Sequence, residues 1–152
     1  MRVDPLFSQA EVEAELREGV SRKIKTITRD LQYAGEEIVT EARTGAKTLG
    51  KDYKTQTGNL RSSIGYTIIY QGETLAIGGF TPIAGGEEGA EKGREVATQL
   101  ATEESDLDTL KLTVVAGMDY ASPLSAKGYD VLDTAELIAR DKTDEIKRIH
   151  SL

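Results

Sequence analysis

Apolar residues in the first third of the chain recur at steps of three and four, which places side chains on one face of an α-helix. The set is Val12, Leu16, Val20, Ile24, Ile27, Leu31, Ala34, Ile38 and Ala42. Ser8 and Glu11 precede it at the spacing of a capping box, in which a hydroxyl and a carboxylate satisfy the first amides of a helix. The pattern predicts a long amphipathic helix with one buried face.

A second pattern, alternation of apolar and other residues, begins at residue 64 and predicts β-strands. Residues 64–70 and 74–79 alternate around a turn at 71–73, which predicts a hairpin, and residues 110–116 alternate again. Asp133 and Glu136 mark the start of a last helix. Its expected inner side is Leu137, Ile138, Ile146 and Ile149. The predicted fold is α+β: one domain over residues 1–152, in which a long N-terminal amphipathic helix and a C-terminal helix pack on a small antiparallel β-sheet.

The segment 81–109 interrupts this order and carries most of the charge. It holds eight acidic residues against Lys92 and Arg94, which gives −6 out of the net −7 of the chain. Its helix-spaced positions are Ala90, Gly93, Ala97 and Leu100. Because these residues offer little apolar area, we expect a flexible acidic insertion, an exposed loop with a marginal helix.

The composition excludes several kinds of chemistry. The chain has no Cys, which excludes disulfides and thiolate sites, and its single His is at position 150. The carboxylates are concentrated in the insertion, where no fixed pair can tune its pKa values. No apolar run approaches the roughly 20 residues of a transmembrane helix. We therefore expect no catalytic, metal-binding or cofactor-binding residues, no enzyme activity and no membrane partner.

The segment "TGNLRSSI", residues 57–64, places a Gly, an Arg and two Ser directly before a strand. One interpretation is a loop that binds an anion through its Arg and Ser side chains. The segment lacks the glycine spacing, the following Lys and the preceding strand of a phosphate-binding loop. Thr57 can cap a helical turn in which Leu60 and Ile64 point inward. We favour the second interpretation, a structural joint between helix and sheet in which Ser62 lies on an exposed turn.

Basic residues follow the first helix at steps of three and four: Arg43, Lys47, Lys51 and Lys54. One interpretation is a basic stripe that contacts a phosphate backbone. The other, which we favour, is cations that complement a helix C-terminus together with solvated loop lysines. These four residues, with Glu87 and Glu88 of the acidic insertion, are the candidate partner contacts.

Two short motifs, in this order among these elements, are similar to those of a known family. The first, Thr-Gly-x-Leu-Arg-x-Ser-Ile, is matched by Thr57, Gly58, Leu60, Arg61, Ser63 and Ile64. The second, a strand ending in Gly-x-x-Tyr-Ala before a further Gly, is matched by Gly117, Tyr120, Ala121 and Gly128. The chain, except for the acidic insertion, thereby resembles the head–tail connector and tail-completion proteins of long-tailed bacteriophages.

The resemblance implies a structural virion protein of the phage neck or tail top, made in the cytoplasm of the bacterial host. It implies a homo-oligomeric ring, a hexamer or a dodecamer, at the head–tail junction beside other neck, portal or tail-tube proteins. DNA would pass such a ring without sequence-specific contacts. The unpaired edge strands of a small open sheet are a physical means of assembling it.

Two alternatives belong to other classes of protein. The charge distribution suggests a non-enzymatic binding module that docks a basic partner through its acidic segment. A small enzyme is the third class, for which Asp119 is the best single candidate acid. Asp119 lies at the end of a strand, two residues after Gly117, so we interpret it as a turn residue.

Overall fold

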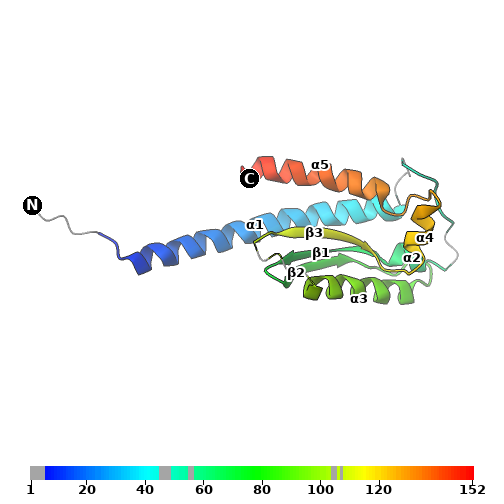
Figure 1. Ribbon diagram of the computed structural model, residues 1–152, viewed down its shortest axis with the longest axis horizontal. Helices are drawn as coiled ribbons and strands as arrows, with labels where there is room; N and C mark the ends of the chain where they lie inside the picture. Colours follow the sequence, from blue (N-terminus) through cyan, green and yellow to red (C-terminus); the bar gives the residue numbers. More distant parts are fainter. Residues whose placement is uncertain (1–5, 45–48, 55–56, 104–105, 107) are drawn as a thin grey trace, which may run out of the picture.

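The computed structural model describes residues 6–44, 49–54, 57–103, 106 and 108–152 (Figure 1). The elements in chain order are α1 (Gln9–Thr44), α2 (Asn59–Ser62), β1 (Ile64–Tyr70), β2 (Glu73–Gly79), α3 (Glu87–Glu103), β3 (Lys111–Ala116), α4 (Ala121–Ala126) and α5 (Asp133–His150). The predicted mixture of helix and sheet is confirmed, as are the long N-terminal helix and the C-terminal helix.

The three strands form one antiparallel sheet, as predicted, and their order in it is β2-β1-β3. Gly65 pairs with Gly79 of β2, and Ile64 pairs with Ala116 of β3. The central strand β1 is buried from Ile64 to Ile69 because it is covered by helices on both faces. Since β2 and β3 are each antiparallel to β1, the two edge strands run parallel to each other.

The C-terminal half of α1 covers one face of the sheet, and α3 covers the other (Figure 1). Gly35 lets α1 approach closely, because a Cβ at this position would lie 2.8 Å from the ring of Tyr66. Helix α5 runs antiparallel beside α1. Near the middle of α5, Lys142 forms an ion pair of 2.8 Å with Glu37 of α1. At the end of α5, the ring of His150 lies 2.8 Å from the carboxylate of Asp30. The main core lies between α1, β1 and α5, to which α5 contributes Ala135 and Ile146.

The N-terminal half of α1, residues 9–26, projects beyond the sheet and beyond the end of α5 (Figure 1). We call it the α1 extension. Val12, Leu16 and Val20 are 46%, 63% and 57% exposed, whereas Ile27 and Leu31 are buried. The predicted helix is therefore present, but the prediction of one buried face is wrong for this half. Among the described residues, the tip of the β1–β2 hairpin comes near this half, where Tyr70, Gln71 and Leu75 share a hollow with Leu16, Val20 and Ile24.

The prediction of an exposed excursion is wrong for Glu87–Glu103, which forms the helix α3 packed on the sheet. Its buried residues are Gly89, Ala90, Gly93, Ala97 and Ala101. Helix α3 can pack on the sheet because glycines let its backbone approach the end of β3 closely. A Cβ built on Gly117 would lie 2.5 Å from the Cα of Gly93. A helix face of small residues contributes little area itself, but it seals Phe80 and Val115 from water. Glu87, Glu91 and Glu95 lie on the exposed side of this helix.

The start of α5 also differs from the prediction. The carboxylate that accepts the amide of Thr134, at 3.1 Å, belongs to the buried Asp130 and not to Asp133. Of the expected inner residues, Ile146 is buried and Ile138 is half-buried, whereas Leu137 and Ile149 are exposed. Ala135 and Ala139 take their place against the core.

Candidate subunit interfaces

The joint segment, residues 57–64, is fitted closely to the loop that precedes α3. Gly58 adopts a left-handed conformation with φ 75° just before α2, and a Cβ there would lie 2.0 Å from the carbonyl oxygen of Ile83. Gly is the residue that adopts such a φ without steric cost. This position therefore requires Gly for backbone conformation and for space, whereas Thr57 before it is exposed.

Both serines of the joint segment point inward. The Ser62 hydroxyl accepts a hydrogen bond of 2.8 Å from the Ile83 N–H, and the Ser63 hydroxyl donates one of 2.8 Å to the Leu60 carbonyl. Both residues are 0% exposed, so the expectation of an exposed turn at Ser62 is wrong. A hydroxyl that is buried and bonded to backbone has no access to an external anion.

Arg61 fastens the end of α1 to the joint segment. Its guanidinium donates a hydrogen bond of 2.6 Å to the carbonyl of Arg43 and lies 3.3 Å from a carboxylate oxygen of Asp52. It also stands 5.2 Å from the centre of the Tyr53 ring, within the range of a cation–π contact. Burial raises the pKa of Tyr53 to about 12, and the nearby Arg61 charge opposes that rise. These contacts hold the segment 49–54 against the joint.

The two motifs that carry the family resemblance lie next to each other in space. The amide of Gly117 donates a hydrogen bond of 3.1 Å to the carbonyl of Ser63. Leu60 packs in one buried cluster with Met118 and Ala121. Ile64, the last residue of the first motif, is fully buried in the main core. The sequence motifs therefore build the corner where the end of β3 meets the beginning of β1.

This corner borders a hollow of about 650 Å³. Its lining brings together residues of both family motifs, one candidate partner contact and three tyrosines. The lining residues are Asp52, Tyr53, Lys54, Thr57, Gly58, Asn59, Leu60, Tyr120, Leu124 and Tyr129. Tyr120 is 41% exposed, and partial burial together with the Glu88 charge raises its pKa. Gly128 does not line the hollow. It has φ 83° and its amide closes the end of α4 by donating to the Ser125 carbonyl at 2.9 Å.

The four basic candidates do not form one surface stripe. Arg43 is buried, where its guanidinium donates to the Thr81 carbonyl, and burial lowers its pKa. Lys51 and Lys54 are exposed, and the backbone of Lys51 bonds to Gly128 and Asp130. Lys47 lies outside the described residues. Of the described candidates, Arg43 lies in the last turn of α1, whereas Lys51 and Lys54 lie outside the helices.

The acidic candidates lie at the start of α3, beside the joint segment. Glu88 accepts a hydrogen bond of 3.2 Å from the side-chain amide of Asn59 and stands 4.0 Å from Lys92. Lys92 also lies 3.9 Å from Asp119. Asp119 is therefore an exposed surface residue beside a Lys, and Glu87 is exposed in the first turn of α3.

Open sheet edges are the features of this fold that are best suited to association. Among the described residues, neither β2 nor β3 has a second strand beside it. On β2, Leu75 and Ile77 are 39% and 43% exposed. The sequence signal for these edge residues was the alternation in 74–79, but the pattern alone does not tell an edge strand from a central one.

The β3 edge faces a groove of about 580 Å³ between β3 and the helices α4 and α5. Leu112, Val114 and Ala116 line it from the strand, and Ser122 and Glu136 line it from the helices. Sequence reasoning missed this groove, because its two walls come from segments that are distant along the chain.

Comparison of the chain with protein-family models, with curated proteins and with solved structures gives no match in any of the three. Within the described residues, none of the helices combines the length and the apolar composition needed to span a bilayer. In the same part of the chain, no three His, Asp or Glu side chains are gathered closely enough to hold a metal ion.

Proposed function

We propose that this chain is a structural subunit that assembles head-to-tail through its sheet edges into a ring at the head–tail junction of a long-tailed bacteriophage. The observation that carries the proposal is the pair of open edges, β2 and β3, which run parallel to each other. The resemblance of the joint segment and of the motif at the end of β3 supplies the phage context.

The direction of the edge strands limits how copies can join. If β2 of one copy extends the sheet of the next at β3, the two strands meet in the same direction and form a parallel pair. Such a contact joins two different surfaces, and repeated around an axis it closes into a ring. A contact between like edges, β2 with β2 or β3 with β3, would instead give a closed two-fold dimer with an antiparallel pair.

The two edges are also unlike in shape, which favours the head-to-tail contact. The β2 edge stands out with Leu75 and Ile77 exposed, whereas the β3 edge lies in the groove beside α4 and α5. A strand added at an edge gains main-chain hydrogen bonds, and its side chains fill pockets beside the edge. A projecting edge against a recessed one buries more surface than two projecting edges can.

The test is to measure the assembly of a variant with a charged β2 edge. Ile77→Lys places a charge at the proposed contact, a change that blocks edge-to-edge pairing in natural sheets. We expect the unmodified protein to form rings as its concentration rises, by sedimentation velocity and negative-stain microscopy. We expect Ile77→Lys to abolish them and the matched change Thr98→Lys, at an exposed position of α3, to leave them intact. Rings that survive Ile77→Lys, or an unmodified protein that forms nothing larger than a dimer at any concentration, would contradict the proposal.

A second candidate function is supported by the exposed acidic side of α3. A module that docks a basic partner would use Glu87, Glu91 and Glu95, which lie at steps of four on that side. Reversing Glu91 and Glu95 to Lys should abolish such docking and leave ring formation unchanged. Pull-down of other neck proteins by the two kinds of variant would therefore separate the two functions.

A further inference from the structure

The α1 extension displays a row of apolar side chains that the rest of the described chain leaves largely exposed. Val12, Leu16 and Val20 are about half exposed or more, and Ile24 is half-buried. Shallow hollows flank this row on both sides. One, of about 490 Å³, is centred on Gly19, and the other, of about 670 Å³, lies between the helix and the tip of the β1–β2 hairpin. The surface has the shape and the composition of a helix-packing face.

The charges of the same segment are divided into two blocks. Between residues 11 and 18 there are four Glu and one Arg, and between residues 22 and 29 there are four basic residues: Arg22, Lys23, Lys25 and Arg29. The helix dipole accounts for acidic residues in the first turn only. It gives no reason for a basic block in the middle of a helix of 36 residues.

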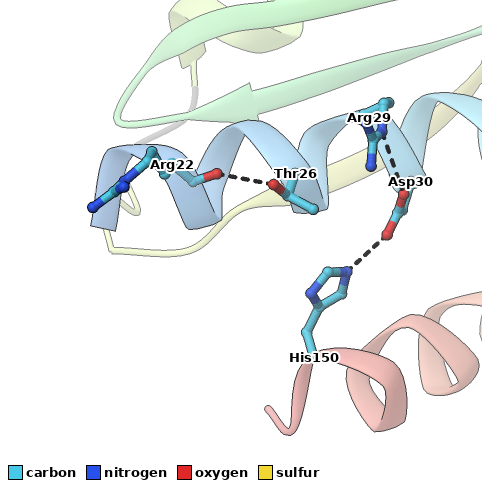
Figure 2. Close-up of polar contacts among 5 residues, drawn as sticks. All are labelled: Arg22, Thr26, Arg29, Asp30 and His150. Atoms are coloured by element: carbon cyan, nitrogen blue, oxygen red, sulfur yellow. Dashed lines mark hydrogen bonds and ion pairs between the residues drawn. The ribbon is translucent and has the colours of Figure 1, made fainter. Parts of the chain in front are cut away.

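Within one chain this division leaves some like charges as neighbours. Glu11 and Glu15 are four residues apart, and so are Lys25 and Arg29, and such like pairs destabilise a helix, although Glu13 with Arg17 and Glu18 with Arg22 are opposite pairs at the same spacing. Among the described residues, no ion pair is formed by Glu15, Glu18, Arg22 or Lys25. Figure 2 shows Arg22 extending from the helix with no contact drawn to its guanidinium, whereas Asp30 is turned toward His150 on α5.

We infer that the α1 extension pairs with the α1 extension of a second copy, antiparallel and around a two-fold axis at the level of Glu18. Antiparallel pairing places the acidic block of each copy beside the basic block of the other. Parallel pairing would place acid beside acid and base beside base. The charge pattern therefore selects both the partner and its direction, while the apolar row supplies the buried area.

The register follows from matching apolar residues. With Leu16 level with the second copy's Val20, Val12 is level with Ile24, so that all four layers are apolar. The same register brings Glu13 level with Lys23 and Glu11 level with Lys25. The paired segment, residues 9–27, is about 28 Å long at 1.5 Å per residue. It ends before Asp30, where α5 begins to occupy the side of α1, and the second helix would lie beside the hairpin tip that borders Leu16, Val20 and Ile24.

This pairing does not rest on the proposed ring. The α1 extension and the sheet edges are separate surfaces, so each contact can be removed without the other. The surfaces also differ in symmetry, because the helix pair is a closed two-fold contact and the sheet-edge contact is head-to-tail.

Charge reversal tests the pairing. An acid-reversed variant, Glu13→Lys with Glu15→Lys, and a base-reversed variant, Lys23→Glu with Lys25→Glu, each place like charges opposite one another in an antiparallel pair. In sedimentation velocity with Ile77→Lys present in every chain, so that sheet-edge contacts are removed, we expect the protein with an unaltered α1 extension to be dimeric and each charge-reversed variant alone to be monomeric. An equimolar mixture of the two should regain a heterodimer. The matched reversal Glu91→Lys with Glu95→Lys, on α3, should leave the dimer unchanged.

Cysteine cross-linking tests the direction and the register, since the chain has no Cys of its own. Val12→Cys and Ile24→Cys chains, mixed under mild oxidation, should give a cross-linked pair of one chain of each kind. Either variant alone should not cross-link, because its two sulfurs would be about 18 Å apart along the helices. Cross-linking of Val12→Cys alone would show a parallel pair and overturn the inference. A monomeric unmodified protein, or dimers that persist in both charge-reversed variants, would also overturn it.

Discussion

The backbone N–H of Ile83 donates a hydrogen bond of 2.8 Å to the hydroxyl of Ser62, which is completely buried between the joint segment and the loop before α3. Ser62→Ala would leave that amide without its acceptor. We expect a loss of about 1–3 kcal/mol in the free energy of unfolding, measured by urea denaturation. Ser122→Ala, at an exposed position of α4, is the control and should stay within about 0.5 kcal/mol. An equally small effect of Ser62→Ala would mean that the hydroxyl does not hold the loop.

Two glycines within helices should respond oppositely to the same change. Gly93→Ala places a methyl group 2.5 Å from the Ser63 carbonyl oxygen and the Phe80 ring, so α3 must move away from the sheet. We expect a destabilisation of about 1–3 kcal/mol from this overpacking. At Gly19 nothing lies within 4 Å, so Gly19→Ala should gain helix stability, up to about 1 kcal/mol. Thermal unfolding followed by circular dichroism compares the two, and a neutral Gly93→Ala would contradict the close packing of α3.

Replacing residues 86–104 with a Gly/Ser linker should unfold the protein or make it insoluble. The loss of α3 would expose Phe80 and Val115, which are 1% and 5% exposed beneath it, together with one face of β1. The measurement is the thermal midpoint of whatever soluble protein remains. A midpoint close to that of the full chain would mean that α3 is dispensable for folding, as its sequence suggested.

Stability should fall at high pH because of a buried tyrosine. Burial, and then the hydrogen bond of 3.0 Å that its hydroxyl donates to Glu36, raise the pKa of Tyr66 to about 12. In the unfolded chain a Tyr ionises near pH 10. The unfolded state therefore loses its proton first, so the stability is complete below about pH 10 and declines as the pH rises toward 12.

Urea denaturation at a series of pH values between about 8 and 11 measures this decline. Tyr66→Phe should make the dependence shallower, at the cost of the hydrogen bond to Glu36. Part of the dependence should remain, since burial also raises the pKa of Tyr53 to about 12. Tyr33→Phe, at a side chain that is 71% exposed, controls for the substitution itself. An unchanged pH dependence in Tyr66→Phe would rule out this residue as its source.

The sequence by itself determined the elements whose pattern is local and strong. The capping box at Ser8 and Glu11 forms as predicted, with the amide of Ser8 donating to the Glu11 carboxylate at 2.7 Å. The steps of three and four defined α1, and alternation defined the three strands, because helix and strand each impose their own period on the side chains. The joint segment was also identifiable from local signals, which are the Gly, Arg and Ser residues before an apolar run and the spacing of the apolar Leu60 and Ile64.

Only the tertiary structure decided which of these surfaces is covered. The apolar row of α1 is equally regular along its length, yet Leu31 is buried and Leu16 is exposed, because burial depends on where the sheet and α5 end. The small residues of α3 gave no hydrophobic signal, since what matters there is how closely Gly93 lets two backbones approach. Asp130 caps α5 because the fold buries its carboxylate beside Thr134. Periodicity fixes the direction of a side chain relative to its own backbone, but the neighbour it meets is set by chain packing over long sequence distances.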